Sequence, residues 1–99
     1  MNITAQQAKE IMDTQEGYII LDVRTQAEYG EGHIPGAILI PNDQILEKAE
    51  SVLTNKDQLI LVYCRSGRRS KLASEDLVKL GYTNIKEFGG IIDWPYEVE

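Results

Sequence analysis

The sequence predicts an α/β domain in which a parallel sheet is covered by helices on both faces. Short apolar runs rich in β-branched residues alternate along the chain with longer polar stretches of helical periodicity. These runs are apolar almost throughout, which is typical of parallel strands buried on both faces. Glycine and proline mark the ends of many segments. Taken in order, strands are expected at residues 18–23, 37–40, 58–63 and 85–88.

Two capping boxes predict where the first helices begin. Thr4-Ala5-Gln6-Gln7 places a threonine three residues before a glutamine, and a helix is expected from there to about Asp13, before Gly17 breaks the pattern. Thr25-Gln26-Ala27-Glu28 repeats the pattern and predicts a short helix that ends at the glycines 30 and 32.

The later helices are bounded by proline and glycine. Pro41 leads into a helix expected from about Asn42 to Leu53, and a further helix over 71–80 should stop at Gly81. After the last strand, two glycines should turn the chain into a short helical tail over 91–99. The inward face of the helix after Pro41 is expected to consist of Ile45, Leu46, Ala49 and Leu53.

Length and composition narrow the classes of function. Residues 1–99 suit one small domain with a single core. The net charge of −6 argues against nucleic acid and against an anionic membrane surface as partners. One cysteine and one histidine exclude a disulfide framework and a cysteine- or histidine-rich metal site, so no metal or other cofactor is expected. The start of the chain does not resemble a signal peptide and no stretch is long enough to span a bilayer, which predicts a cytoplasmic protein, expected as a monomer.

The single cysteine lies where a strand gives way to a cationic loop and then to a helix. Cys64 ends an apolar strand, and arginines 65, 68 and 69 with Lys71 follow it in an otherwise acidic chain. A helix start presents unpaired N–H groups and a partial positive charge, and such a turn can form a nest that holds an anion. Guanidinium groups add full charge. A thiolate is stabilised in such surroundings, so Cys64 is the candidate nucleophile.

The residues after Cys64 are expected to bind a small anion. Backbone N–H groups of Arg65, Ser66, Gly67, Arg68, Arg69 and Ser70 should point at the sulfur, and the arginine side chains should attract the substrate. Gly67 is expected to permit a positive φ, and Ser70 to cap the following helix. Asp22 and Arg24 end a neighbouring strand at the same edge of the sheet, and together with Glu28 they are expected to form an ion-pair set beside the pocket.

These motifs together resemble the rhodanese family of thiosulfate sulfurtransferases. The loop Cys64-Arg65-Ser66-Gly67-Arg68-Arg69-Ser70 resembles the active-site loop of that family. Two further signatures match in the same order: Asp22-Val23-Arg24 with Glu28-Tyr29 and Gly32-His33-Ile34-Pro35-Gly36-Ala37, and then Gly89-Gly90-Ile91 with Trp94. The resemblance implies a three-layer α/β/α rhodanese-like fold with a five-stranded, mainly parallel sheet, in which the loop after the fourth strand surrounds the cysteine sulfur.

The resemblance also implies a reaction. The Cys64 thiolate would take the sulfane sulfur of thiosulfate, or of another small anionic donor, as a persulfide and pass it to cyanide or a thiol. Substrate would be bound by the loop from Arg65 to Ser70, with Asp22, Arg24 and Glu28 in support.

Three alternatives remain open from the sequence. The chain could carry persulfide to a biosynthetic acceptor, or it could be a non-catalytic rhodanese-like module, although such modules typically lack the cysteine. A phosphatase or arsenate reductase of the cell-cycle phosphatase type has five residues between its cysteine and a clamping arginine. In this chain Ser70 occupies the position of that arginine, six residues after Cys64, and Arg69 comes one residue too early.

Overall fold

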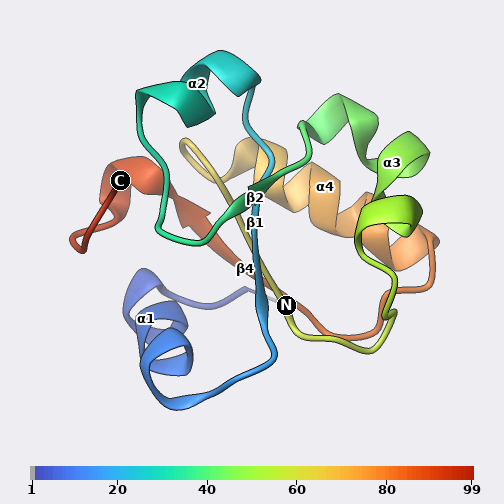
Figure 1. Ribbon diagram of the computed structural model, residues 1–99, viewed down its shortest axis with the longest axis horizontal. Coiled ribbons are helices and arrows are strands. Elements are labelled where there is room, and N and C mark those ends of the chain that lie inside the picture. Colours follow the sequence, from blue (N-terminus) through green and yellow to red (C-terminus); the bar gives the residue numbers. More distant parts are fainter. Residues whose placement is uncertain (1) are drawn as a thin grey trace.

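The computed structural model describes residues 2–99 and contains a four-stranded parallel sheet with strand order β2-β1-β3-β4 (Figure 1). The strands are β1 (Ile19–Asp22), β2 (Ile38–Leu39), β3 (Ile60–Cys64) and β4 (Ile85–Gly90). The helices are α1 (Ala5–Thr14), α2 (Gln26–Glu31), α3 (Ile45–Val52) and α4 (Arg68–Lys79), with 3₁₀ turns η1 (Asn42–Gln44) and η2 (Ile91–Asp93). All four strands were predicted, and both capping boxes form at Thr4 and Thr25.

Helices cover both faces of the sheet, as the apolar strands require. On one face, α3 and α4 pack against β1 and β3 in a cluster that includes Leu21, Val62, Ala49 and Leu77. On the other face, α1 and the C-terminal segment cover a second cluster that includes Ala8, Leu61 and Trp94 (Figure 1). The central strand β3 is fully buried, so Cys64 at its end is held by packing from both sides.

The expectation of five strands is wrong: the sheet in the described residues has four. In place of a fifth strand, a single parallel bridge joins Asn2 to Glu87, and the Ile3 N–H donates to the Glu87 carbonyl at 2.9 Å. Thr4 already caps α1, so the chain turns into the helix before a longer ladder can form.

Two helices differ from the prediction, one in the orientation of a side chain and the other in the residue at which it begins. Leu46 is 56% exposed rather than inward, because the buried stripe of α3 follows the i, i+4 spacing of Ile45, Ala49 and Leu53, and Leu46 is rotated about 100° from Ile45. The helix α4 begins at Arg68 rather than at residue 71, so Ser70 lies within its first turn and is not its cap.

The C-terminal segment is also not a helix beyond Asp93. Instead the chain runs back to the segment after α2, where the backbones of His33 and Glu99 exchange hydrogen bonds of 3.0 and 2.9 Å. None of the helices in residues 2–99 is long and apolar enough to cross a membrane.

Candidate functional site

Cys64 occupies the carboxyl end of β3, directly before the loop that leads into α4. Cys64 is 1% exposed, and the Gly67 N–H donates a hydrogen bond to the Cys64 sulfur at 3.0 Å. Gly67 adopts a φ of +106°, which residues with a Cβ rarely adopt, and this conformation lets the loop double back onto the sulfur. The start of α4 follows at once, so the partial positive charge of that helix is next to the thiol.

A second chain segment closes the loop from the side. Gly90 of β4 pairs with Cys64, after a shift of register between β3 and β4. A Cβ on Gly90 would stand only 1.9 Å from the Arg65 carbonyl oxygen. The Ile92 N–H donates to that same oxygen at 3.2 Å. The glycine pair was predicted to turn the chain, but Gly89 and Gly90 continue β4 and allow it to lie against the loop.

Ser70 and Glu87 lie buried beneath the loop. The Cys64 thiol donates to Ser70 Oγ at 3.5 Å, and Ser70 Oγ is 2.7 Å from Glu87 Oε2. Ser70 is 0% exposed and Glu87 only 8%. Sequence reasoning missed Glu87, although a charged residue two positions after the buried Ile85 of a short strand is a signal that could have drawn attention to it.

The three loop arginines differ in their surroundings. Arg65 and Arg68 are exposed, and within residues 2–99 neither guanidinium has an ion-pair partner. Arg69 instead places its two terminal nitrogens on Glu28 of α2, at 2.6 and 2.9 Å. Of the three loop arginines, only Arg65 and Arg68 are therefore free of an ion pair within residues 2–99.

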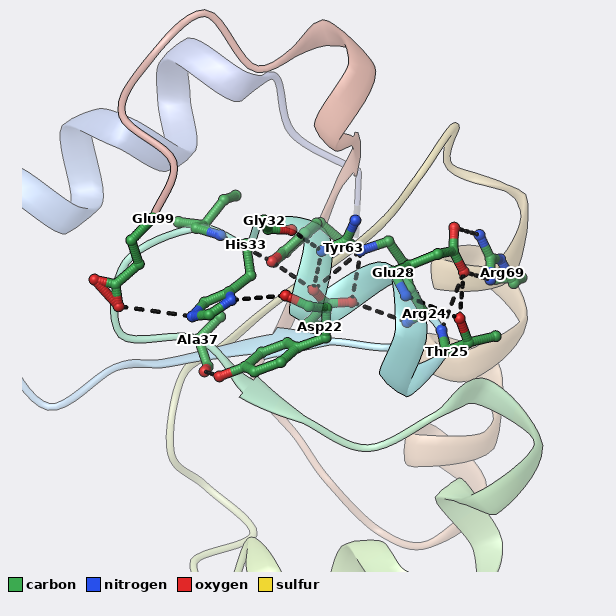
Figure 2. A network of polar contacts seen from close by, with 12 residues as sticks. Asp22, Arg24, Thr25, Glu28, Gly32, His33, Ala37, Tyr63, Arg69 and Glu99 are labelled. Carbon is green, nitrogen blue, oxygen red and sulfur yellow. Dashed lines mark hydrogen bonds and ion pairs between the residues drawn. The ribbon is translucent and has the colours of Figure 1, made fainter.

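Asp22, Arg24 and Glu28 form ion pairs in two separate groups rather than in one set (Figure 2). Asp22 accepts from Arg24 Nη2 at 2.6 Å and from the Tyr63 hydroxyl at 2.7 Å. The same Arg24 nitrogen also donates to the Gly32 carbonyl at 2.7 Å, which fixes the end of α2. Glu28 forms the second group with Arg69. These contacts tie α2 both to β1 and to the start of α4, so they position the loop from a neighbouring element.

The Glu28–Arg69 pair predicts a dependence of stability on pH. The hydrogen bonds from Arg69, aided by those from Thr25, lower the pKa of Glu28 from 4.5 to about 2. A carboxylate with a depressed pKa stabilises the fold above about pH 4.5, and this stabilisation is lost as the pH falls towards 2. Because the pair is partly exposed, we expect Glu28→Gln to lower the free energy of unfolding by about 1 kcal/mol at pH 7.

Urea denaturation of wild type and Glu28→Gln at pH 7, 4.5 and 3 measures this dependence. The difference between the two proteins should narrow as the pH falls through this range. Glutamine can keep the capping contact with the Thr25 backbone, so the difference reports mainly on Arg69. A gap that stays constant with pH would contradict the assignment.

The described residues contain no group of three or more histidine, cysteine or carboxylate side chains placed to hold a metal ion. The groups around Cys64 are its thiol, the exposed guanidinium groups of Arg65 and Arg68, the Gly67 N–H, the Ser70 hydroxyl and the buried Glu87 carboxylate.

Comparison with known proteins places this arrangement in a family. The rhodanese-like domain model matches residues 4–95. The thiosulfate sulfurtransferase PspE of Escherichia coli is 37% identical over 73 residues, which are 74% of this chain and 70% of that protein. The putative sulfur carrier protein YrkF of Bacillus subtilis is 35% identical over 98 residues, which are 98% of this chain but only 52% of that protein.

A solved structure of a rhodanese-like domain has the same fold as this chain. The rhodanese-like domain of the Anabaena protein Alr3790 superposes with a TM-score of 0.91 at 28% identity, covering 99% of this chain and 77% of that one. With a family model that spans nearly all of its length and a matching fold, this chain belongs to the rhodanese-like family.

Proposed function

We propose that the protein is a sulfurtransferase in which Cys64 accepts a sulfane sulfur from thiosulfate and passes it on. One observation carries the proposal: the Gly67 N–H donates to the Cys64 sulfur at 3.0 Å, at the start of α4 and beneath a loop with two unpaired arginines. This geometry stabilises negative charge on a sulfur atom rather than on a larger group.

The reaction proceeds in two displacements. The thiolate attacks the outer sulfur of thiosulfate, a new S–S bond forms, and the bond to the sulfite sulfur breaks with its electron pair leaving on sulfite. The Cys64 persulfide then gives its outer sulfur to cyanide or to a thiolate, and the Cys64 thiolate is regenerated. Ping-pong kinetics are expected.

The loop argues against phosphate as the substrate. A phosphate clamp would need an arginine whose two nitrogens face the anion. The arginine nearest to that role, Arg69, has both terminal nitrogens on Glu28. The proposed substrate is therefore an anion that offers sulfur to the cysteine and meets exposed cations at the rim.

A persulfide-carrier role is a second candidate. Its support is the similarity over 98% of this chain to a protein named as a putative sulfur carrier. Such a role uses the same first half-reaction, with a protein or small-molecule persulfide as donor and a biosynthetic thiol as acceptor.

Intact mass measurement tests the first half-reaction. Reduced protein exposed to thiosulfate should gain one sulfur atom, and Cys64→Ala should gain none. Cyanide should then remove the added sulfur and form thiocyanate. If wild type gains no sulfur while iodoacetamide still labels Cys64, thiosulfate is not the donor, and persulfide donors should be tested in its place.

The unpaired arginines predict a difference among loop variants. Because Arg65 and Arg68 are exposed cations at the rim, we expect Arg65→Ala/Arg68→Ala to lower kcat/KM for thiosulfate by about 10-fold or more and to weaken its dependence on salt. Arg69→Ala should leave that salt dependence largely intact, since Glu28 already neutralises Arg69. Initial rates from 20 to 500 mM salt provide the measurement. Equal salt slopes for the double variant and wild type would show that rim charge does not recruit the donor.

A further inference from the structure

A buried hydrogen-bonded chain joins the sulfur of Cys64 to a carboxylate. The Cys64 sulfur is 3.5 Å from Ser70 Oγ, which is 2.7 Å from Glu87 Oε2. The displacement at sulfur described above makes no use of Glu87. A carboxylate that is 8% exposed beside an anion-binding loop is costly to keep there, because two anions would repel each other at close range.

The hydroxyl of Ser70 can serve only one acceptor at a time. Three oxygens lie within its reach: Glu87 Oε2 at 2.7 Å, the Gly67 carbonyl at 2.9 Å and the Gly89 carbonyl at 3.4 Å. The carboxylate is both the nearest and the strongest acceptor. While the Ser70 hydroxyl donates to Glu87, the lone pairs of Ser70 Oγ face the Cys64 sulfur. Ser70 can then accept a hydrogen bond from a protonated thiol, but it cannot donate one to a thiolate.

The direction of the hydrogen bonds between Cys64, Ser70 and Glu87 reverses if the thiol proton leaves the sulfur. We propose that Ser70 and Glu87 form a proton relay that ionises Cys64, an inference that rests on the proposed function only in taking Cys64 as the nucleophile. The S–H bond breaks and its proton binds Ser70 Oγ, while the proton of Ser70 passes to Glu87 Oε2. The electron pair stays on sulfur, and nothing is oxidised or reduced.

The reversed hydrogen bonds leave only one negative charge in the site. Glu87 becomes a neutral acid that donates to Ser70, and Ser70 donates to the thiolate. The single negative charge thereby moves from the carboxylate to the sulfur, where the Gly67 N–H and the start of α4 stabilise it. The two anions do not have to coexist.

Glu87 also has its own route to water. It lines a surface hollow of about 300 Å³ together with Lys71 and Glu75 of α4, whereas the Cys64 residue is 1% exposed. A proton delivered to Glu87 can leave on that side of β4 without crossing the loop. Other charged groups near the relay are Lys86, adjacent on the same strand, the exposed Arg65 and Arg68 of the loop, and Arg69, whose charge lies within electrostatic range of Cys64.

A purely structural role for Glu87 makes a different prediction. Glu87 Oε2 accepts the Gly89 N–H at 2.6 Å and so supports the irregular end of β4. Glutamine keeps an oxygen for that bond but cannot accept a proton at neutral pH. Glu87→Gln therefore separates the relay from the support of the strand, and Ser70→Ala breaks the relay while leaving the Gly89 contact in place.

The test measures alkylation of Cys64 by iodoacetamide, which does not depend on any sulfur donor. Rates are followed by intact mass from pH 5 to 9 for wild type, Glu87→Gln, Glu87→Asp, Ser70→Ala and the double variant Ser70→Ala/Glu87→Gln. Glu75→Gln is the matched control, because it removes the same charge from the same hollow without contacting Ser70.

At pH 6 we expect Glu87→Gln and Ser70→Ala each to react about 10-fold or more slowly than wild type, the double variant to be no slower than either, and Glu75→Gln to be unchanged. The deficit should shrink towards pH 9, where water and hydroxide take the proton directly. Glu87→Asp should keep most of the rate.

Several outcomes would overturn the relay. The first is that Glu87→Gln is alkylated as fast as wild type or faster. The second is that the rate losses of the two single variants multiply in the double variant. The third is that the rate loss of the variants does not vary with pH. If Glu87→Gln fails to fold, Ser70→Ala and Glu87→Asp decide, and Ser70→Ala reacting as fast as wild type excludes the relay. Failure of thiosulfate to load Cys64 would count against the proposed donor and would leave this result intact.

Discussion

Replacing Gly90 with alanine is expected to abolish sulfur transfer and to lower the free energy of unfolding by about 3 kcal/mol or more. A Cβ at this position would stand 1.9 Å from the Arg65 carbonyl oxygen, 2.4 Å from its carbon and 2.6 Å from Ser66 Cα. All three are backbone atoms, so no side-chain rotation relieves the overlap. Either β4 separates from β3 and uncovers the loop, or the loop itself is displaced and the N–H of Gly67 moves away from the sulfur.

Gly30→Ala is the matched control. Gly30 lies within α2, and a Cβ there would meet nothing within 4 Å. Because alanine is the better helix former by up to about 1 kcal/mol, this variant should be as stable as wild type or more so, with full activity. Thermal and urea denaturation together with persulfide loading give the comparison. A Gly90→Ala protein that is stable and loads sulfur normally would show that close contact between β4 and the loop is not required.

The sequence was sufficient to predict most of the scaffold because the signals were local. The capping threonines 4 and 25, the fully apolar strand before Cys64 and the helix-ending Gly81 depend on neighbouring residues alone, and the elements form where they were expected. Leu46 was assigned wrongly because its apolar side chain was taken as inward, whereas the buried stripe of α3 runs along Ile45, Ala49 and Leu53 and leaves Leu46 at its edge.

The placement of Cys64 could be predicted from the sequence, but the contacts around it could not. The order strand, cysteine, loop, helix along the chain predicted that Cys64 ends a strand before a loop and a helix, and it does. The pairing of Arg69 with Glu28, and the contact of Ser70 with Glu87, join residues 41 and 17 positions apart, and only the packing of α2 and β4 against α4 brings them together. Ser70 looked like a helix cap because its type favours caps, whereas the backbone of Gly67 takes that place and leaves the hydroxyl to face the sulfur.

The buried pair of Asp22 and Arg24 predicts the largest loss of stability from a single side-chain truncation. Asp22 is 0% exposed and accepts the Tyr63 hydroxyl as well as the Arg24 backbone and guanidinium. Burial, together with the hydrogen bond to Asp22, raises the pKa of Tyr63, so its hydroxyl remains a donor throughout the working range of pH. We expect Asp22→Ala to lower the free energy of unfolding by about 3–5 kcal/mol, because a buried guanidinium and a buried hydroxyl lose their acceptor.

A second variant shows where that loss arises. If the cost comes from the uncompensated charge of Arg24, then Asp22→Ala/Arg24→Met should be more stable than Asp22→Ala alone, even though it removes more contacts. Tyr63→Phe, which loses only the hydroxyl bonds to Asp22 and to the Ile34 N–H, should cost about 1–2 kcal/mol. Urea denaturation of the four proteins at pH 7 provides the comparison. A double variant less stable than Asp22→Ala would mean that Arg24 stabilises the fold mainly through its bond to the Gly32 carbonyl, and that the end of α2, rather than the charge pair, is what this network secures.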